Sequence, residues 1–298
     1  MTHVPVMTAE VVRYLLPERG GLFVDCTVGL GGHARALLEA GATRLLGLDR
    51  DPEALARARA ALSAWADRVE LVHADYRSLD EVLDSRRLTT IDGALADLGV
   101  SSLQFDAPGR GFSFQRDEPL DMRMDQTAGD TAADLVARAT EEELANAIFE
   151  YGEERFSRRI ARALVHARRE GRVDTTGRLA AIVRRAIPRR GFARIDPATR
   201  TFQALRIWVN RELEGLDRFL ETVARRLAIG ARLAVITFHS LDDRIVKHTL
   251  RALEQQAGVL KVLTKKPIVP GDGEVERNPR ARSAKLRAAE KVAAAEPR

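Results

Sequence analysis

Short apolar runs alternate with helical patterns over the first hundred residues of the chain. We expect helices at 34–40 and from Pro52, which suits a first helical position, to about residue 62. Strand–helix alternation at this spacing predicts a parallel, doubly wound α/β sheet with right-handed crossovers. The apolar runs that are expected as buried strands are 22–25, 44–49, 69–73 and 91–97.

The alternation stops near residue 107, and no comparable strand follows until after residue 211. A loop rich in glycine and proline is followed there by helical patterns, and the sheet pattern then returns. We therefore predict one Rossmann-like domain in two parts, residues 1–106 and 214–298, interrupted by an all-helical insertion at 107–213. The helices expected in the insertion are 141–150, 153–170, 175–187 and a long one after Pro197.

The second part of the sheet domain begins with an apolar strand pattern at 232–238. A helix near 241–256 and a short strand at 259–263 follow it. The basic end of the chain leaves two alternatives open: a flexible tail, or a last edge strand at 283–292.

Composition and cysteine content indicate where in the cell this protein is expected to work. The chain has 298 residues, of which 45% are hydrophobic and 31% charged, as in ordinary globular proteins of about two domains. It has no apolar run of membrane-spanning length, and residues 1–10 do not read as a signal peptide. One cysteine, Cys26, excludes an intrachain disulfide. We expect a cytoplasmic protein without a membrane partner.

Positive charge is concentrated in the insertion. Residues 155–206 hold fifteen arginines and three acids, a net charge of +12 in a chain whose total is +5. A basic block in an otherwise acidic protein is typical of polyanion binding, although a solvated helical face in an arginine-rich proteome would give the same pattern. We interpret it as a nucleic-acid interface.

A glycine-rich turn follows the first expected strand. It runs from Asp25 to His33 and has glycines at 29, 31 and 32, which allow close backbone approach to a ligand. Ligands of doubly wound sheets bind beyond the carboxyl ends of the strands. We therefore expect this turn, including His33, to lie at a cofactor site.

Two later strand ends add candidate cofactor ligands. Asp49 ends the second expected strand, where a carboxylate can accept hydrogen bonds from a ribose diol. Asp75 and Tyr76 follow the third, where the tyrosine ring can pack on adenine.

The turn is compatible with two cofactor classes. Gly29, Gly31 and Ala34 also satisfy the dinucleotide pattern G-x-G-x-x-[GA], so an NAD-dependent oxidoreductase is one alternative. Asp25 favours the other, because its carboxylate would repel a pyrophosphate but suits the ammonium and sulfonium charges of a methionine-derived methyl donor.

The candidate chemistry follows the fourth strand, which ends at Asp97. An exocyclic base amine is a poor nucleophile, and an acceptor such as this carboxylate would offset the positive charge that grows on its nitrogen. The structural alternative is that Asp97 only caps a helix.

Methylation at a pyrimidine carbon usually needs a cysteine nucleophile. The one cysteine, Cys26, belongs to the glycine turn, which disfavours carbon methylation and leaves nitrogen or oxygen acceptors. No metal-ligand spacing or P-loop is present.

Candidate substrate contacts mix guanidinium groups with aromatic rings, which hold phosphates and stack bases. One cluster spans 110–124, and a packed loop is its structural alternative. A second spans 238–244, where His239 is a candidate proton acceptor or a structural histidine. The expected substrate-binding residues are Arg110, Phe112, Phe114, Arg123, Arg184, Arg185, Arg200, Arg206 and Arg244.

Taken together, these segments resemble the bacterial RsmH/MraW family of ribosomal RNA methyltransferases. The resemblance runs from His3 nearly to the C-terminus. Its ordered blocks are 3–6, 25–33, 97–102, 110–124, 151–156, 197–207, 238–244 and 278–287.

The resemblance implies a class I methyltransferase fold that uses S-adenosyl-L-methionine. The implied acceptor is the N4 amine of a decoding-centre cytidine in 16S rRNA, and the implied role of the insertion is substrate recognition. The family commonly has phenylalanine in place of Tyr76. The implied cofactor-site residues are Gly31, Gly32, His33, Asp49, Tyr76, Asp97 and Gln104.

Two further functional alternatives are kept open. The chain could be a ribosome-assembly factor that binds RNA without turnover, or it could methylate another nucleic-acid base amine. DNA amine methyltransferases usually have a Pro-Pro-aromatic stretch after the strand-four acid, from which Leu98-Gly99-Val100 departs. The expected partner is 16S rRNA in the small ribosomal subunit, and the sequence leaves a homodimer open.

Overall fold

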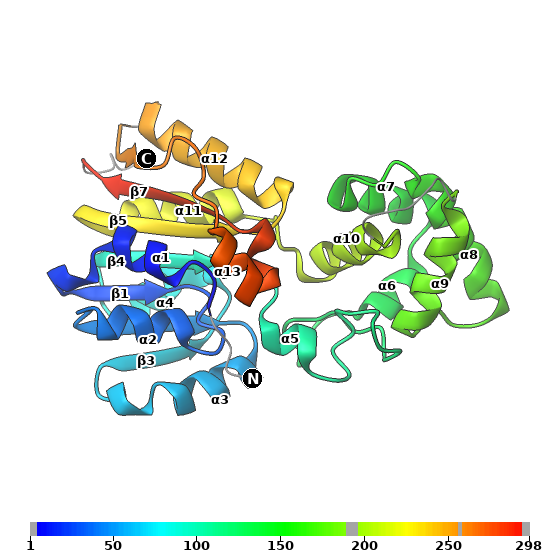
Figure 1. The fold of residues 1–298 in the computed structure, drawn as a ribbon, viewed down its shortest axis with the longest axis horizontal. Coiled ribbons are helices and arrows are strands. Elements are labelled where there is room, and N and C mark those ends of the chain that lie inside the picture. The colour runs from blue at the N-terminus through cyan, green and yellow to red at the C-terminus, as the bar shows by residue number, and fades with distance from the viewer. Residues whose placement is uncertain (1–4, 189–195, 256–257, 294–298) are drawn as a thin grey trace. The chain divides into compact units, whose positions relative to one another are not determined.

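The computed structural model describes residues 5–188, 196–255 and 258–293 (Figure 1). It divides the chain into two compact units. The sheet unit comprises Met1–Gly99 and Leu213–Arg298, and the helical unit is Val100–Glu212. Three arginines of the basic block, Arg189, Arg190 and Arg194, lie outside the described residues, as does the first part of the 3–6 block.

The sheet unit is built on seven strands in the order β3-β2-β1-β4-β5-β7-β6. All neighbouring pairs from β3 to β5 are parallel, and β7 is antiparallel to both of its neighbours. Strand order reverses at β1 and β4, which makes this a doubly wound sheet with its switch point there and confirms the predicted α/β class. The strands are β1 (Leu22–Asp25), β2 (Arg44–Asp49), β3 (Val69–His73), β4 (Ile91–Asp97), β5 (Leu227–Thr237), β6 (Leu260–Val262) and β7 (Lys285–Lys291).

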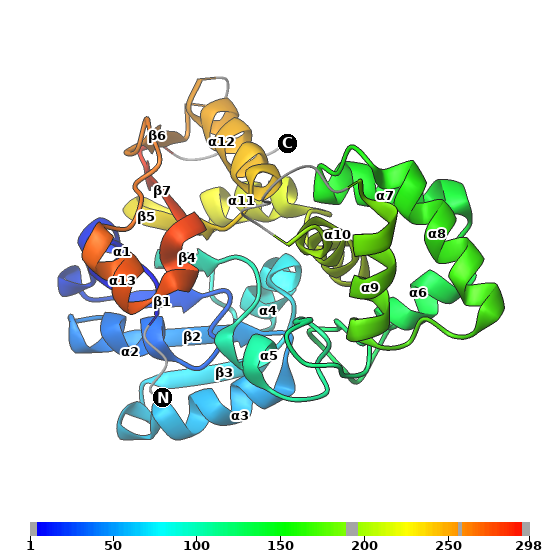
Figure 2. The same cartoon turned by 45° about the vertical axis from the view of Figure 1, so that its right-hand side comes forward.

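Helices cover both faces of the sheet (Figures 1 and 2). On one face, α1, α2 and α3 bury a cluster with Phe23, Leu45 and Leu95. On the other, α4, α11 and α12 bury a second cluster with Val24, Leu46 and Val235. Alternate residues of each strand thus enter opposite cores. The helices are α1 (Thr8–Leu15), α2 (Gly32–Glu39), α3 (Pro52–Ala61), α4 (Leu79–Ser85), α11 (Leu216–Arg226) and α12 (Ser240–Gln255); a short α13 (Asp272–Arg277) lies beside α1.

The C-terminal segment forms neither a free tail nor an edge strand over the described residues. β7 lies between β5 and β6, with Val235 opposite Arg287 and Val262 opposite Ala289. The three-residue β6 takes the edge instead. Both faces of β7 are buried in the two cores of the sheet unit: Leu286 and Ala288 enter one and Ala289 the other, which explains the apolar residues amid a basic sequence.

The helical unit has its own core, and α6, α7 and α9 begin at side-chain caps. Thr131 and Thr140 form capping boxes with Asp134 and Glu143, and Thr175 caps α9. Each cap satisfies backbone N–H groups that a first helical turn leaves unpaired. The helices are α5 (Ser102–Asp106), α6 (Ala132–Arg138), α7 (Glu141–Gly152), α8 (Ser157–Glu170), α9 (Thr176–Ala186) and α10 (Ala198–Asn210).

Two boundaries differ from those expected. The helix expected from residue 153 begins at Ser157, because Glu153 has a left-handed backbone that ends α7 and the carboxylate of Glu154 accepts from Phe156 N in the intervening turn. Residues 100–106 group with the helical unit rather than with the sheet. Phe105 packs against Phe112 of that unit, with ring centroids 6.5 Å apart.

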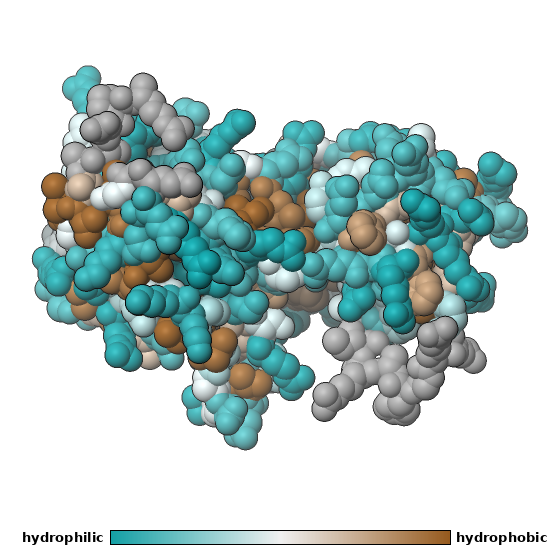
Figure 3. Space-filling model, turned by 90° about the horizontal axis from the view of Figure 1, so that it is seen from above, coloured by the Kyte–Doolittle hydropathy of each residue, from teal (hydrophilic) through white to brown (hydrophobic). Residues whose placement is uncertain are grey.

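No helix among the described residues is long and apolar enough to cross a membrane. Hydrophilic side chains cover most of the face drawn in Figure 3, on both units.

Candidate functional site

Three carboxylates end three adjacent strands of the sheet unit. Asp25 ends β1, Asp49 ends β2 and Asp97 ends β4, and these strands are neighbours in the order β2-β1-β4. The parallel register places all three at the carboxyl edge, beside the switch point. An edge with this charge attracts cationic groups and repels phosphates.

The glycine turn connects β1 to α2 across this edge. Gly29 and Gly31 have φ values of 52° and 82°, in the left-handed region that favours glycine. A Cβ on Gly32 would lie 2.9 Å from the Pro5 side chain. The turn thus needs glycine for its backbone path at 29 and 31 and for close packing at 32.

Asp25 is buried at the base of the turn, with 1% of its surface exposed. Its Oδ1 accepts from Thr27 N at 3.2 Å, and its Oδ2 has no hydrogen-bond partner among the described residues. Burial raises the pKa of Asp25 to about 7, although the neighbouring His33 opposes the rise. An unpartnered buried carboxylate oxygen is costly unless a ligand donor meets it. Asp25 therefore fits a cationic or N–H-bearing ligand.

Asp49 holds the turn from the neighbouring strand. Its Oδ2 accepts from Gly29 N at 2.8 Å, and its Oδ1 accepts from Asp51 N at 2.9 Å. Burial raises the pKa of Asp49 to about 6, and these two backbone donors limit the rise. Each oxygen keeps a second lone pair, so the carboxylate can still accept a ligand hydroxyl.

His33 and Asp97 face each other across the site. The His33 Nε2 lies 3.5 Å from Oδ2 of Asp97. Burial alone would lower the pKa of His33, but the carboxylates of Asp97 and Asp25 outweigh it, so the pKa is raised. Within the described part of the chain, Oδ1 of Asp97 and Nδ1 of His33 have no hydrogen-bond partner. With 25% of its side chain exposed, Asp97 is open to a second ligand.

Asp75 and Tyr76 lie after β3 as expected, but Asp75 is engaged within the protein. Arg77 donates to both of its oxygens, at 2.7 and 2.8 Å, and this pair outweighs burial and lowers the pKa of Asp75. The Tyr76 ring packs against Phe219, with centroids 4.7 Å apart. The Tyr76 ring is therefore held in place by packing. The Asp75 carboxylate is occupied by hydrogen bonds from Arg77, in the turn that follows β3.

At the end of β5, His239 is tied to the first turn of α12. Its Nδ1 accepts from Asp242 N at 3.3 Å and lies 3.4 Å from Asp242 Oδ1. Nδ1 is thereby engaged within the first turn of α12. Arg244 is exposed on α12.

Gln104 belongs to the helical unit, where it completes a cap. Its Oε1 accepts from Ser101 N at 2.9 Å, and its own N donates to the Ser101 hydroxyl. Its expected contact with the cofactor stays a prediction.

The 110–124 cluster is largely internal to the helical unit. Arg110 is 3% exposed and donates to the carbonyls of Arg123 and Met124. Phe112 is in the core. Arg123 forms a two-pronged pair with Asp121, at 2.8 and 3.0 Å. These contacts account for a packed loop without any substrate.

Phe114 differs from the rest of that cluster because it meets the basic helices. Its ring packs edge-on against Phe202, with centroids 4.7 Å apart, and the Arg184 guanidinium lies 5.5 Å from its centroid.

The structure separates the arginines of the basic block into paired and unpaired groups. Arg184 pairs with Asp196, Arg206 with Glu212, and Arg200 with the Glu153 carbonyl. Arg185 is exposed, and no partner is found for it among the described residues. The same holds for Arg158, Arg159 and Arg169 of α8, which the sequence did not single out.

Two further contributors to the site were also missed. Thr27 links the ends of β1 and β4, because its hydroxyl accepts from Asp97 N at 2.7 Å. Glu274 of α13 accepts from Met7 N at 2.6 Å and contributes to the raised pKa of His33. Thr27 lies inside the glycine turn and could have been found there; Glu274 is brought in from a distant segment without a sequence signal.

A glycine turn lined by acids at the switch point of a doubly wound sheet defines a Rossmann-like protein with a site for a cation-bearing ligand. The chain belongs to the MraW methylase family, whose model matches residues 1–292.

Relatives cover nearly the whole chain. The ribosomal RNA small subunit methyltransferase H of Nitratidesulfovibrio vulgaris (strain DP4) is 52% identical over 308 residues, covering 97% of this chain and 95% of that protein. The protein of the same name from Sorangium cellulosum is 51% identical over 294 residues, covering 99% and 92%. Among solved structures, an rRNA methylase from Streptococcus thermophilus aligns with a TM-score of 0.43 at 13% identity, covering 96% and 94%.

Proposed function

We propose that this methylase transfers a methyl group from S-adenosyl-L-methionine to the exocyclic N4 amine of a decoding-centre cytidine in 16S rRNA of the small ribosomal subunit. The observation that carries the chemistry is the unpartnered Asp97 oxygen at the end of β4. The names of the two relatives support rRNA of the small subunit as the substrate class. The family resemblance of the sequence blocks supports cytidine N4 as the acceptor.

The free carboxylate oxygens fit this cofactor. Asp25 Oδ2 offers an acceptor for its cationic groups, Asp49 suits the ribose diol, and Tyr76 offers a ring for adenine. When bound, S-adenosylmethionine would supply a methyl group that its sulfonium activates toward nucleophiles. The same acids disfavour a pyrophosphate, which argues against the NAD alternative.

Asp97 has the role of hydrogen-bond acceptor for the target amine. The nitrogen becomes positively charged as it bonds to carbon, and a carboxylate that accepts its N–H stabilises that charge. His33 keeps the carboxylate in place from the opposite side, 3.5 Å away. His239, two residues after the end of β5, is a second candidate to receive the departing proton.

Cofactor affinity should depend on pH through Asp25 and Asp49. Both pKa values are raised, to about 7 and about 6, so both side chains hold protons below pH 6. The cationic groups of the cofactor require the charged form of Asp25, and the ribose hydroxyls donate more strongly to the charged form of Asp49. Affinity should therefore rise with pH up to about 7, by up to about tenfold per unit for each proton released. Titration calorimetry from pH 5.5 to 7.5 measures this.

Asp25→Asn is the matched control for this titration. It should weaken binding at pH 7 and remove the part of the pH dependence that lies near 7. Wild-type affinity that stays constant from pH 5.5 to 7.5 would contradict the assigned cofactor contacts.

RNA binding should depend on the unpaired arginines of α8. Arg158 and Arg169 are eleven residues apart, so they lie on one face of the helix, and both are exposed. Arg158→Glu/Arg169→Glu should reduce the slope of log affinity against log salt by about 1.4 for single-stranded RNA. Fluorescence anisotropy over a salt series measures this, and cofactor affinity should not change.

The control is the double reversal at Arg59 and Arg87, two exposed arginines of the sheet unit for which no ion pair is found in the described part of the chain. It should leave the salt slope unchanged. If the salt slope falls equally in both double variants, α8 has no special role in RNA binding.

A further inference from the structure

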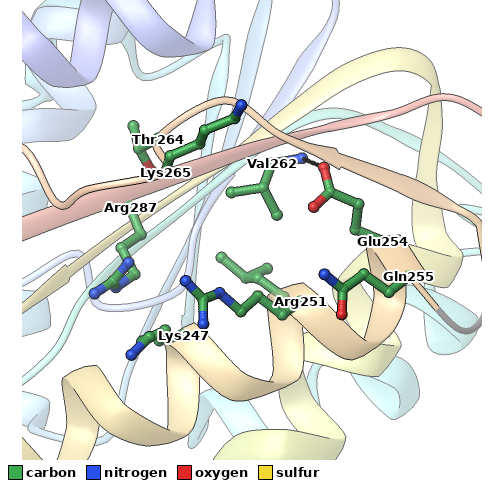
Figure 4. A pocket seen from close by; sticks show the side chains of 9 residues that line it. Lys247, Arg251, Glu254, Gln255, Val262, Thr264, Lys265 and Arg287 are labelled. Carbon is green, nitrogen blue, oxygen red and sulfur yellow. Dashed lines mark hydrogen bonds between the residues drawn. The ribbon is translucent and has the colours of Figure 1, made fainter.

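A basic pocket lies in the sheet unit, away from the acid-lined edge. It has a volume of about 230 Å³ and opens between α12, β7 and the segment that follows β6 (Figure 4). Its apolar lining is aliphatic, from Leu250 and Val262. Among the described residues no aromatic side chain lines it, so this lining lacks a platform for base stacking.

Four cations line this pocket against one acid. The acid, Glu254, is occupied at its Oε1 by Val262 N, at 2.8 Å. Figure 4 shows this hydrogen bond as a dashed line, and it also shows the four cationic side chains. The cations come from three different segments: Lys247 and Arg251 from α12, Lys265 from after β6, and Arg287 from β7. A solvated helical face would instead draw its charges from one helix.

Arg287 forms the fixed wall of the pocket. It is 5% exposed, and Asp243 holds its guanidinium with bonds of 2.7 and 3.2 Å. That pair neutralises Arg287. Lys247, Arg251 and Lys265 have no ion pair within residues 5–188, 196–255 and 258–293. Three cations on long side chains, none of them in an ion pair among these residues, therefore face a preformed cavity whose lining holds a single acid, Glu254.

The pocket is connected to the proposed reaction edge along α12. Arg244, Lys247 and Arg251 follow the spacing i, i+3, i+7, which places them on one side of the helix. α12 begins at Ser240, three residues after β5 ends at the carboxyl edge. At 1.5 Å per residue, Lys247 and Arg251 lie roughly 10 to 16 Å along the helix from that edge. A strand of nucleic acid can span this distance within a few nucleotides.

We propose that this pocket binds a backbone phosphate of the RNA whose base is methylated, a few nucleotides away from the target. The inference rests on the proposed function only in taking RNA as the substrate class. Guanidinium and ammonium groups recognise phosphate oxygens with charge-assisted hydrogen bonds. The absence of an aromatic lining favours a backbone phosphate over a base. Anchoring the strand here positions the target nucleotide at the Asp97 edge.

The test is Lys247→Gln/Arg251→Gln in the full chain, with Arg59→Gln/Arg87→Gln as the matched control. RNA affinity is measured by fluorescence anisotropy, over a salt series, with a labelled single-stranded RNA of mixed sequence. Removing two phosphate contacts should reduce the salt slope by about 1.4 in the pocket variant and by nothing in the control. Cofactor affinity, measured in parallel, should match wild type and confirms that the variant is folded.

The outcomes are distinct from those of the proposed function, because RNA binding is read without methyl transfer. An unchanged slope and affinity in the pocket variant would overturn the proposal. Inorganic phosphate and a mononucleotide are titrated as competitors. If the pocket variant loses binding of inorganic phosphate or the mononucleotide while RNA binding stays normal, the pocket serves a free phosphorylated ligand, and the RNA assignment is wrong.

Discussion

Asp97→Ala is expected to lower the rate of methyl transfer by at least about 10²- to 10³-fold, the typical cost of removing one group that stabilises transition-state charge. The carboxylate is the acceptor that we assign to the target amine. Its loss should act on kcat, because the charge on nitrogen develops only as the bond to carbon forms. The measurement is single-turnover methylation with labelled S-adenosylmethionine.

The fold should survive this change. Asp97 Oδ1 has no hydrogen-bond partner in the part of the chain that the structure describes, and the strand end is held through its backbone N, which donates to the Thr27 hydroxyl. Asp97→Asn is the matched variant: it keeps an acceptor oxygen without the charge, so its rate should fall between wild type and Asp97→Ala. Normal turnover in Asp97→Ala, with unchanged thermal unfolding, would refute the assignment.

Asp49→Ala should weaken cofactor binding by about 100-fold and change kcat at saturating cofactor far less. The carboxylate is the assigned acceptor for the ribose diol, and hydrogen bonds to a charged group contribute about 1.5–3 kcal/mol each. The substitution also removes the acceptor of Gly29 N, which positions the glycine turn. Calorimetry gives Kd, and methylation at saturating cofactor gives kcat.

Asp49→Asn separates these two contributions. It keeps one carbonyl oxygen that can accept from Gly29 N, but it loses the charge. We therefore expect an intermediate Kd. If Asp49→Ala lowers kcat as strongly as Asp97→Ala while leaving Kd unchanged, the division between cofactor-binding and catalytic carboxylates would be wrong.

The sheet and its acid edge could be predicted because their signals are local. Buried parallel strands give continuous apolar runs, and each of Asp25, Asp49 and Asp97 ends such a run. Parallel strands put their carboxyl ends on one edge, so the strand pattern alone was enough to group the three acids. The position of β7 could not be predicted, since it depends on the distant pairing of Arg287 with Val235.

Which arginines are free to bind a ligand could not be predicted from the sequence. The basic block indicates a polyanion surface, but charge counting cannot tell a free guanidinium from a paired one. Arg184 meets Asp196 twelve residues later, and Arg110 turns inward to two carbonyls of its own loop. The pocket on α12 lies outside the basic block altogether, because it is assembled from three segments of the sheet unit.

The central claim is tested most directly by incubating the protein with methyl-labelled S-adenosylmethionine and bacterial small subunits that lack their native methylations. Nucleoside analysis of the 16S rRNA then identifies the product. The account predicts labelled N4-methylcytidine at a decoding-centre position, and none with Asp97→Ala. Measurable cofactor binding without any label on subunits or free rRNA would contradict it and would favour an RNA-binding assembly factor. Label on another nucleoside would contradict the assigned acceptor.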